Sequence, residues 1–178
     1  MRSPRLIDLA TGAFRLALAV GLTAFSACFN HAKVSALTAE QSIAVTNSVR
    51  EFAATVASDV TKRGPLAWLD HFANTPAFFM VVDGQVAFQN GAAAVRGIQE
   101  LPSKIARIEL RWGDSIRVDP LTPTLAMVAT VWHEVIVDPA GRKTEQGGYF
   151  TGLAELGPTG WRFRDANWTV VNSPSPVQ

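Results

Sequence analysis

The sequence of 178 residues contains a single cysteine, at position 28. One cysteine cannot form a disulfide bond within its own chain, so no covalent cross-link stabilises the fold. Histidine is also scarce, because His31, His71 and His133 are the only three, and neither an HxH nor an HExxH spacing occurs. The zinc sites that these spacings build need more ligands than the sequence offers, so we predict no metal.

The sequence also lacks the short motifs of several enzyme classes. It contains no GxSxG nucleophile elbow, no GxGxxG fingerprint and no Walker loop. We therefore predict no cofactor and no serine nucleophile. The charges nearly balance, with 16 Lys and Arg against 15 Asp and Glu. Because there is no dense basic stripe to contact a phosphate backbone, we predict no nucleic-acid partner.

The N-terminal region differs from the rest of the chain. Three arginines within residues 1–15 precede the apolar run LALAVGLTAFSA at 16–27. Its 12 residues are too few to cross a bilayer as a helix, but they suit the core of a signal peptide. The run ends in FSAC, which resembles a bacterial lipobox with Phe25 where leucine is usual. The resemblance implies a signal peptide over 1–27, lipidation of Cys28, and anchoring of an exported protein to a membrane of the bacterial cell envelope.

Two other interpretations of this region stay open. The segment Val34-Ser35-Ala36 fits the small-x-small rule for ordinary cleavage after Ala36, which would leave a free protein in the periplasm. Alternatively, residues 1–27 form a buried helix of the fold. Residues 1–27 hold three arginines and one aspartate, so without them the formal charge changes from +1 to −1. The positive balance of the whole sequence therefore belongs to the predicted export signal.

Hydrophobic spacing predicts one domain over 38–171, preceded by a linker at 28–37 and followed by a disordered, Pro- and Ser-rich tail at 172–178. Thr38 and Gln41 form a capping-box pattern at the start of a long helix. Asp83-Gly84 favours a tight hairpin. The predicted elements are helices at 38–62, 65–72 and 91–105, a hairpin at 77–90, and strands at 107–118, 124–137, 144–156 and 161–171.

This order predicts an α+β fold, in which three N-terminal helices pack on a strongly curved antiparallel sheet to form a cone-shaped barrel with an open mouth. The C-terminal GWRFRDANWTV at 160–170 and the Arg96-Gly97-Ile98 segment resemble the SnoaL-like branch of the nuclear transport factor 2-like superfamily. The resemblance covers roughly residues 40–171 and implies a pocket inside the cone and a homodimer formed through the sheet. The superfamily includes isomerases, cyclases, dehydratases and ligand binders without catalytic activity, so the fold alone does not choose a function.

Strand alternation predicts the lining of that pocket. The more apolar face of 124–137 is expected inward, with His133 as its polar member. We predict His133 and Asp165 as a catalytic pair, because a carboxylate in an apolar pocket has a raised pKa and an imidazole can relay its proton. The predicted ligand-binding residues are Trp112, Asp114, Met127, Val131, Tyr149, Phe163 and Asn167. The alternative is that His133 is structural and that Asp165 and Asn167 face solvent.

Three functions remain open. The first is binding of a small apolar or amphipathic molecule in the pocket. The second is a cofactor-free isomerase, cyclase or dehydratase that uses the His133 and Asp165 pair. The third is an assembly module of the cell envelope that uses the outer sheet face and performs no pocket chemistry, which predicts a large exposed apolar patch.

Overall fold

The computed structural model describes residues 36–171. The predicted signal peptide over 1–27, Cys28 and the predicted disordered tail at 172–178 lie outside the described residues, as does most of the predicted linker. Within residues 36–171, no helix is both long enough and apolar enough to cross a membrane.

Helix α2 (Ala39–Arg63) is the long helix that the sequence predicts. The Gln41 backbone N–H donates to Thr38 Oγ1 over 3.1 Å, and the Gln41 side chain accepts from the Thr38 backbone N–H, so the capping box is confirmed. The buried residues of the helix form one stripe: Val45, Val49, Phe52, Ala53, Val56 and Val60. Ile43 is 62% exposed, so it does not belong to this stripe.

The other helices are shorter than predicted. The segment at 65–72 is a 3-10 turn, η2 (Pro65–Ala67), followed by one turn of α-helix, α3 (Trp68–His71). Helix α4 (Gly91–Glu100) is capped by Asn90, whose side chain accepts from the Ala93 N–H. Its last turn tightens into η3 (Leu101–Ser103), which contains Pro102, a residue without an N–H to donate.

Seven strands form one mixed sheet in the order β2-β1-β7-β6-β5-β3, and β4 also pairs with β5. The strands are β1 (Phe79–Val82), β2 (Gln85–Phe88), β3 (Arg107–Trp112), β4 (Arg117–Thr122), β5 (Leu125–Val137), β6 (Lys143–Gly157) and β7 (Gly160–Val170). The predicted strand at 107–118 is two strands, and each pairs with a different half of β5. The expectation of a purely antiparallel sheet is wrong, because β1 pairs with β7 in parallel.

The β1–β2 hairpin is confirmed, since Asp83 and Gly84 adopt φ values of 49° and 74° at its turn. The Asp83 N–H donates to the Trp168 carbonyl over 2.9 Å, and Asp83 Oδ1 accepts from the Val170 N–H over 2.6 Å. The hairpin turn is therefore hydrogen-bonded to β7 as well as to its own strands.

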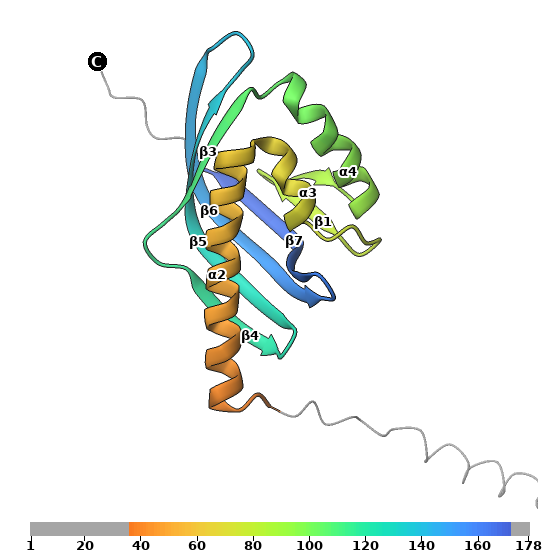
Figure 1. Ribbon diagram of the computed structural model, residues 1–178, viewed down its shortest axis with the longest axis vertical. Coiled ribbons are helices and arrows are strands. Elements are labelled where there is room, and N and C mark those ends of the chain that lie inside the picture. Colours follow the sequence, from red (N-terminus) through yellow and green to blue (C-terminus); the bar gives the residue numbers. More distant parts are fainter. Residues whose placement is uncertain (1–35, 172–178) are drawn as a thin grey trace, which may run out of the picture. The chain divides into compact units, whose positions relative to one another are not determined.

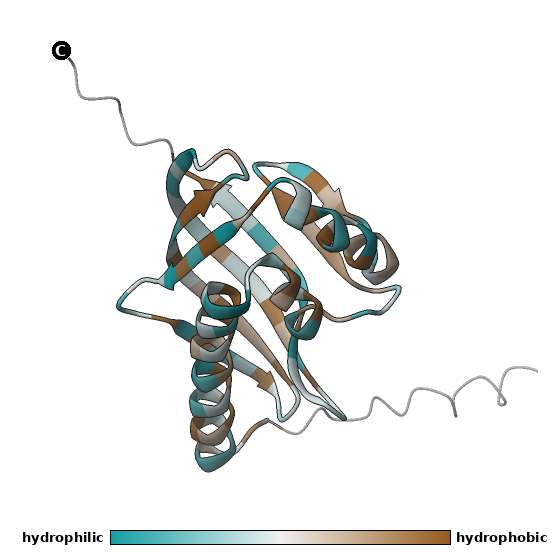
Figure 2. Ribbon diagram, turned by 45° about the horizontal axis from the view of Figure 1, so that its top comes forward, coloured by the Kyte–Doolittle hydropathy of each residue, from teal (hydrophilic) through white to brown (hydrophobic). Residues whose placement is uncertain are grey.

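Helix α2 crosses one face of the curved sheet, and α3 and α4 lie beside it (Figure 1). Figure 2 shows hydrophobic and hydrophilic residues alternating along the strands. The core lies between the helices and the inner face of the sheet, where Phe150, Phe163 and Val128 are at most 1% exposed. The α+β class is as predicted, with the curved sheet open rather than closed into a barrel.

Candidate functional site

Strand β5 buries the face opposite to the predicted one. Its buried residues are Ala126, Val128, Thr130, Trp132 and Glu134. Met127, Val131 and His133 are exposed on the outer face. Alternation separates the two faces of a strand but does not say which one packs against the helices. Here the large Trp132 ring fills the inner layer, and the more apolar face remains outside.

On β7, a β-bulge places the predicted site residues Asp165 and Asn167 on the outer face of the sheet. Ala154 of β6 pairs with Phe163, whereas the preceding Leu153 pairs with Asp165, so Arg164 is the extra residue. The bulge reverses the alternation after Phe163. Phe163 is fully buried, but Asp165 and Asn167 are exposed on the outer face.

The predicted catalytic pair is therefore wrong in its geometry. On β6, His133 pairs with Gly147 and Asp165 lies opposite Leu153, six positions further along the strand. At about 3.3 Å per residue, the two side chains stand roughly 20 Å apart. His133 instead lies 2.7 Å from Glu145, measured from Nε2 to Oε1, and 46% of its side chain is exposed.

The predicted ligand-binding residues do not line a common pocket. Met127, Val131, Tyr149 and Asn167 are exposed on the outer face, and Phe163 belongs to the core. Asp114 is exposed in the loop between β3 and β4. Trp112 faces inward as predicted, and its Nε1–H donates to the Ala53 carbonyl over 2.7 Å.

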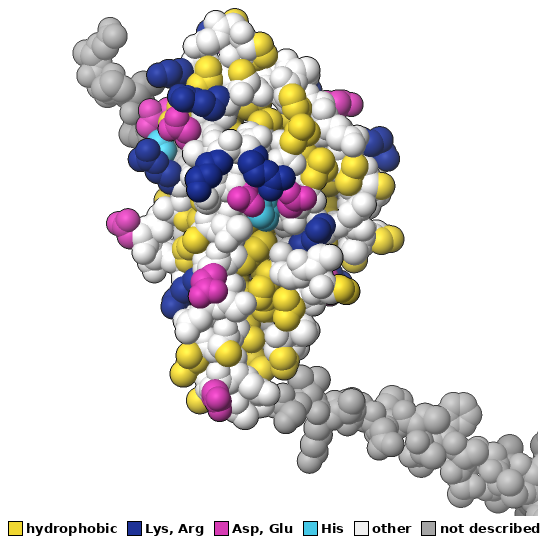
Figure 3. Space-filling view, viewed as in Figure 1, with side chains coloured by type: hydrophobic (Ala, Val, Ile, Leu, Met, Phe, Trp, Pro, Cys, Tyr) yellow, Lys and Arg dark blue, Asp and Glu magenta, His cyan; other side chains and the backbone are white. Residues whose placement is uncertain are grey.

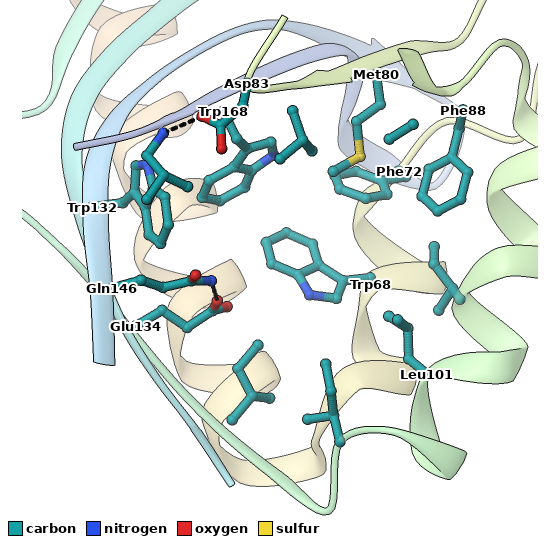
Figure 4. Close-up of a pocket in the computed structure, with 16 residues that line it drawn as sticks. Trp68, Phe72, Met80, Asp83, Phe88, Leu101, Trp132, Glu134, Gln146 and Trp168 are labelled. Carbon is teal, nitrogen blue, oxygen red and sulfur yellow. Dashed lines mark hydrogen bonds between the residues drawn. The ribbon is translucent and has the colours of Figure 1, made fainter. Parts of the chain in front are cut away.

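A cavity of about 400 Å³ lies between the inner face of the sheet, α3, α4 and the β1–β2 hairpin. Aromatic and aliphatic side chains dominate its wall, and Figure 4 shows Trp68 standing across the cavity from Glu134 and Gln146. The lining residues are Trp68, Phe72, Met80, Val82, Asp83, Ala87, Phe88, Ile98, Leu101, Ile105, Ile108, Trp132, Glu134, Gln146, Trp168 and Val170. Neither Lys, Arg nor His is among them.

Glu134 is the buried ionisable group of this wall, at 9% exposure. Gln146 is its partner in the β5–β6 register, and Gln146 Nε2 donates to Glu134 Oε2 over 2.9 Å. Burial raises the pKa of Glu134, and the hydrogen bond from Gln146 opposes that rise. The cavity can therefore hold a carboxyl group that keeps its proton at a higher pH than an exposed glutamate does.

Three tryptophans form the other notable part of the wall. The Trp168 ring centroid lies 5.2 Å from that of Trp132 and 5.7 Å from that of Trp68, in edge-to-face contacts. Trp132 Nε1–H donates to the Tyr149 carbonyl over 3.2 Å. Within residues 36–171, Trp168 Nε1 is the one buried side-chain nitrogen or oxygen without a hydrogen-bond partner.

A second group of ionisable side chains lies outside the cavity and joins α2 to α3. His71 Nε2 lies 3.1 Å from Asp59 Oδ2, and Arg63 bonds Asp70 over 2.6 Å. Burial lowers the pKa of His71, and Asp59 opposes that shift. Figure 3 shows acidic and basic side chains gathered around a histidine on the helical face. None of the four residues lines the cavity, so the group serves to dock the two helices.

The part of the chain that the structure describes contains no group of three or more His, Cys, Asp or Glu side chains that could hold a metal ion. Glu134, Gln146, Trp68 and Trp168 are site residues that the sequence did not reveal. The available signal was Glu134, the single carboxylate on a strand whose other polar residues are Thr130 and His133. The expectation that the face of His133 points inward places Glu134 and Trp132 on the opposite, outer face.

No family model and no curated protein matches the sequence. Solved structures do match, and they share the nuclear transport factor 2-like fold. A candidate scytalone dehydratase from Novosphingobium aromaticivorans has a TM-score of 0.65 and 10% identity, covering 79% of this chain and 94% of that one. A superfamily protein from Salmonella enterica serovar Typhimurium has a TM-score of 0.61 and 13% identity, covering 76% and 99%. A candidate dehydratase from Streptomyces avermitilis has a TM-score of 0.61 and 15% identity, covering 74% and 99%. This protein therefore has the nuclear transport factor 2-like fold.

Proposed function

We propose that this protein, as a SnoaL-like member of the superfamily, binds a small apolar or amphipathic molecule in the cavity. The observation that carries the proposal is the cavity itself: about 400 Å³, walled by aromatic and aliphatic side chains, with one buried carboxyl group. Pockets for small molecules have this character, because apolar walls supply affinity and a few polar groups fix orientation.

The residues of the cavity wall contribute apolar and polar contacts in different places. Trp68, Trp132 and Trp168 offer flat apolar surfaces on the sheet and α3 side, and Phe88 and Leu101 close the side of the hairpin and α4 (Figure 4). Glu134 and Gln146 supply polar atoms on an otherwise apolar stretch of wall. A bound molecule would bury most of its surface against these side chains.

A second candidate is a cofactor-free isomerase, cyclase or dehydratase. The observation that favours it is the raised pKa of Glu134 inside an apolar cavity, because a carboxyl group that holds its proton at a higher pH than an exposed glutamate is suited to act as a general acid. Two of the structures that share the fold are described as candidate dehydratases. In this proposal Glu134 replaces the His133 and Asp165 pair as the general acid or base, and Gln146 holds its carboxylate.

Binding of the neutral fluorescent dye 1-N-phenylnaphthylamine to the purified protein tests the first proposal. We expect saturable binding that Leu101→Trp weakens at least about tenfold, because the larger ring occupies part of the cavity. Ile43→Trp is the matched control, since Ile43 is 62% exposed on α2. Equal binding by both variants, or no saturable binding, would contradict the proposal.

The outer sheet face supports a proposal about partners. Met127, Val131 and Tyr149 are 43%, 50% and 62% exposed, and Val131 and Tyr149 are register partners. An exposed apolar patch of this kind is typical of an interface. We propose that two copies of the protein form a homodimer through this face. The alternative is that a protein of the cell envelope binds to the same face. Export with lipidation at Cys28 likewise stays a proposal.

A further inference from the structure

Resting on the proposed function, we infer that the molecule bound in the cavity is an apolar amine, and that its ammonium group pairs with the carboxylate of Glu134. The two side chains that would hold this group are register partners on neighbouring strands of the wall, Glu134 on β5 and Gln146 on β6. Figure 4 shows both side chains ending close together in the cavity, with Trp68 across from them and Trp132 beside them.

One oxygen of each of these polar side chains is free to bind a ligand. Gln146 Nε2 donates to Glu134 Oε2, which leaves Glu134 Oε1 and Gln146 Oε1 without a donor from the described residues. Within residues 36–171, the one side-chain nitrogen or oxygen that is both sealed from solvent and unpaired is Trp168 Nε1, so these two oxygens keep accessible surface. Two free acceptors therefore stand together on an otherwise apolar stretch of the cavity wall.

Two neighbouring acceptors favour a ligand group that only donates. An ammonium group carries three N–H donors and no acceptor, so it can bond both oxygens at once. A hydroxyl group has one hydrogen to donate and leaves one of the two oxygens unpaired. A carboxylate or phosphate offers no donor when it is ionised, and its negative charge is repelled by an ionised Glu134.

The charges of the wall point to the same class of ligand. The ionisable side chains that line the cavity are Glu134 and Asp83, and neither Lys, Arg nor His accompanies them. A buried carboxylate without a counter-ion is costly, and a bound ammonium group supplies the missing positive charge. The tryptophan rings of the wall add to the attraction, because the face of an aromatic ring attracts a cation within about 6 Å.

The proton of Glu134 competes with such a ligand. Burial raises the pKa of Glu134, whereas a cation beside the carboxylate lowers it. Binding of an ammonium group therefore releases this proton, and affinity increases with pH until Glu134 is ionised in the free protein as well. Asp83 is the other ionisable side chain of the wall, and β3, β6, β7, α3 and α4 contribute none. Asp83 is the weaker counter-ion, because it is exposed and its Oδ1 already accepts from the Val170 N–H.

A matched set of naphthalenes tests this inference. The set comprises 2-(aminomethyl)naphthalene, 2-naphthalenemethanol, 2-ethylnaphthalene and 2-naphthoate, which differ in polar group at nearly equal size. Isothermal titration calorimetry on the whole protein at about pH 8, where a primary amine is still charged, should show the amine binding at least about tenfold more tightly than the alcohol and the hydrocarbon. The naphthoate should bind most weakly of the four.

Glu134→Gln keeps the shape of the side chain and removes its charge. In this variant the affinity for the amine should fall at least about tenfold, while that for the hydrocarbon should change less than about threefold and so report an intact cavity. Glu145→Gln is the matched control and should keep the amine preference, since Glu145 is exposed on β6 and bonds His133 outside the cavity.

The pH dependence of binding gives a second readout. Between about pH 5 and pH 8, the affinity of the wild type for the amine should rise and then level off once Glu134 is ionised. The affinity of Glu134→Gln for the amine, and that of the wild type for the hydrocarbon, should stay constant over the same range.

The results that would overturn the inference are distinct from those against binding itself. Equal affinity for amine, alcohol and hydrocarbon, or tightest binding of the alcohol or the naphthoate, would exclude the amine class and leave the cavity a binding site. An amine preference that survives Glu134→Gln, or one that Asp83→Asn abolishes instead, would show that Glu134 is not the counter-ion. If neither the dye nor any naphthalene binds, the proposed function fails together with the inference.

Discussion

Gln146 holds Glu134 from the neighbouring strand, with its Nε2 donating to Glu134 Oε2 over 2.9 Å across the β5–β6 register. The two residues are twelve positions apart in the chain, and the sheet brings them together on the cavity wall. The burial of Glu134 and its hydrogen bond from Gln146 together set the pH range over which the carboxyl group of Glu134 loses its proton.

Replacing Glu134 with Gln should remove a pH-dependent loss of stability. Burial raises the pKa of Glu134, so the folded protein keeps a proton that the unfolded chain releases once the pH passes the ordinary glutamate value. The wild type therefore loses stability as the pH rises from about 4.3 to the folded pKa, and loses no more from this group above it. The free energy of unfolding of Glu134→Gln minus that of the wild type should rise across this window and then stay constant.

Urea denaturation between about pH 4 and pH 8 measures that difference. Glu51→Gln, at an exposed position of α2, is the control and should give a nearly constant difference. A flat curve for Glu134→Gln would contradict the assignment of Glu134 as a buried acid that is costly to ionise.

The His71 and Asp59 contact should control stability on the acid side. Burial lowers the pKa of His71, Asp59 and Asp70 raise it, and Arg63 lowers it. His71 thus resists protonation in the folded state, and stability is lost as the pH falls from about 6.5 toward the folded pKa. Asp59→Asn should lower the pKa of His71 further and reduce stability at pH 7 by about 1 kcal/mol, because a partly buried hydrogen bond is weakened.

The imidazole signals of His71 in an NMR titration report its pKa directly. The comparison variant is Asp70→Asn, whose carboxylate affects His71 less than that of Asp59 does. An unchanged His71 titration in Asp59→Asn would show that the 3.1 Å contact has no electrostatic effect in solution.

Gly148 in the middle of β6 should tolerate no side chain. A Cβ at this position would overlap the backbone oxygen of Thr169 on β7, and backbone cannot move aside without breaking the ladder. We expect Gly148→Ala to cost more than about 3 kcal/mol in the free energy of unfolding. Gly157→Ala on the same strand meets only one atom, at 3.9 Å, and should cost less than about 1 kcal/mol. Thermal denaturation compares the melting temperatures of the two variants. Similar melting temperatures would contradict the close approach of β6 and β7 at Gly148.

The proposed homodimer depends on the outer sheet face. Val131→Glu places a charge beside Tyr149 in the exposed apolar patch and should convert a dimer to a monomer, because burying an unpaired charge in an interface is costly. Light scattering coupled to size-exclusion chromatography measures the mass. Val86→Glu, 57% exposed on the hairpin, should leave the mass unchanged. A wild type that is monomeric at about 100 µM would contradict the homodimer.

Lipidation at Cys28 predicts a specific change in the mature protein. Expressed in an exporting bacterium and labelled with radioactive palmitate, the wild type should carry the label and Cys28→Ala should lose it. A water-soluble protein whose intact mass begins at Leu37 would instead support cleavage after Ala36.

Local features of the fold could be read from the sequence. The Thr38 and Gln41 capping box, the long helix after it and the Asp83-Gly84 hairpin are set by residues within a few positions of one another. The contacts that form a helix cap or a tight turn join residues at most a few positions apart, so local sequence is enough to predict these elements. The site residues could not be predicted from local sequence in this way. Alternation on β5 defines two faces, and the more apolar face, which was expected inward, is the outer face.

The sequence by itself determined the Thr38 cap of the long helix, the hairpin turn, most of the strands and the α+β class. Only the tertiary structure decided that Trp132 and Glu134 face the cavity while His133 faces outward, and that the bulge at Arg164 turns Asp165 away from the inner layer. The physical reason is that the burial of a strand face depends on what packs against it. Here the packing partners are α2, α3 and α4, which precede these strands by tens of residues and meet them only when the chain folds.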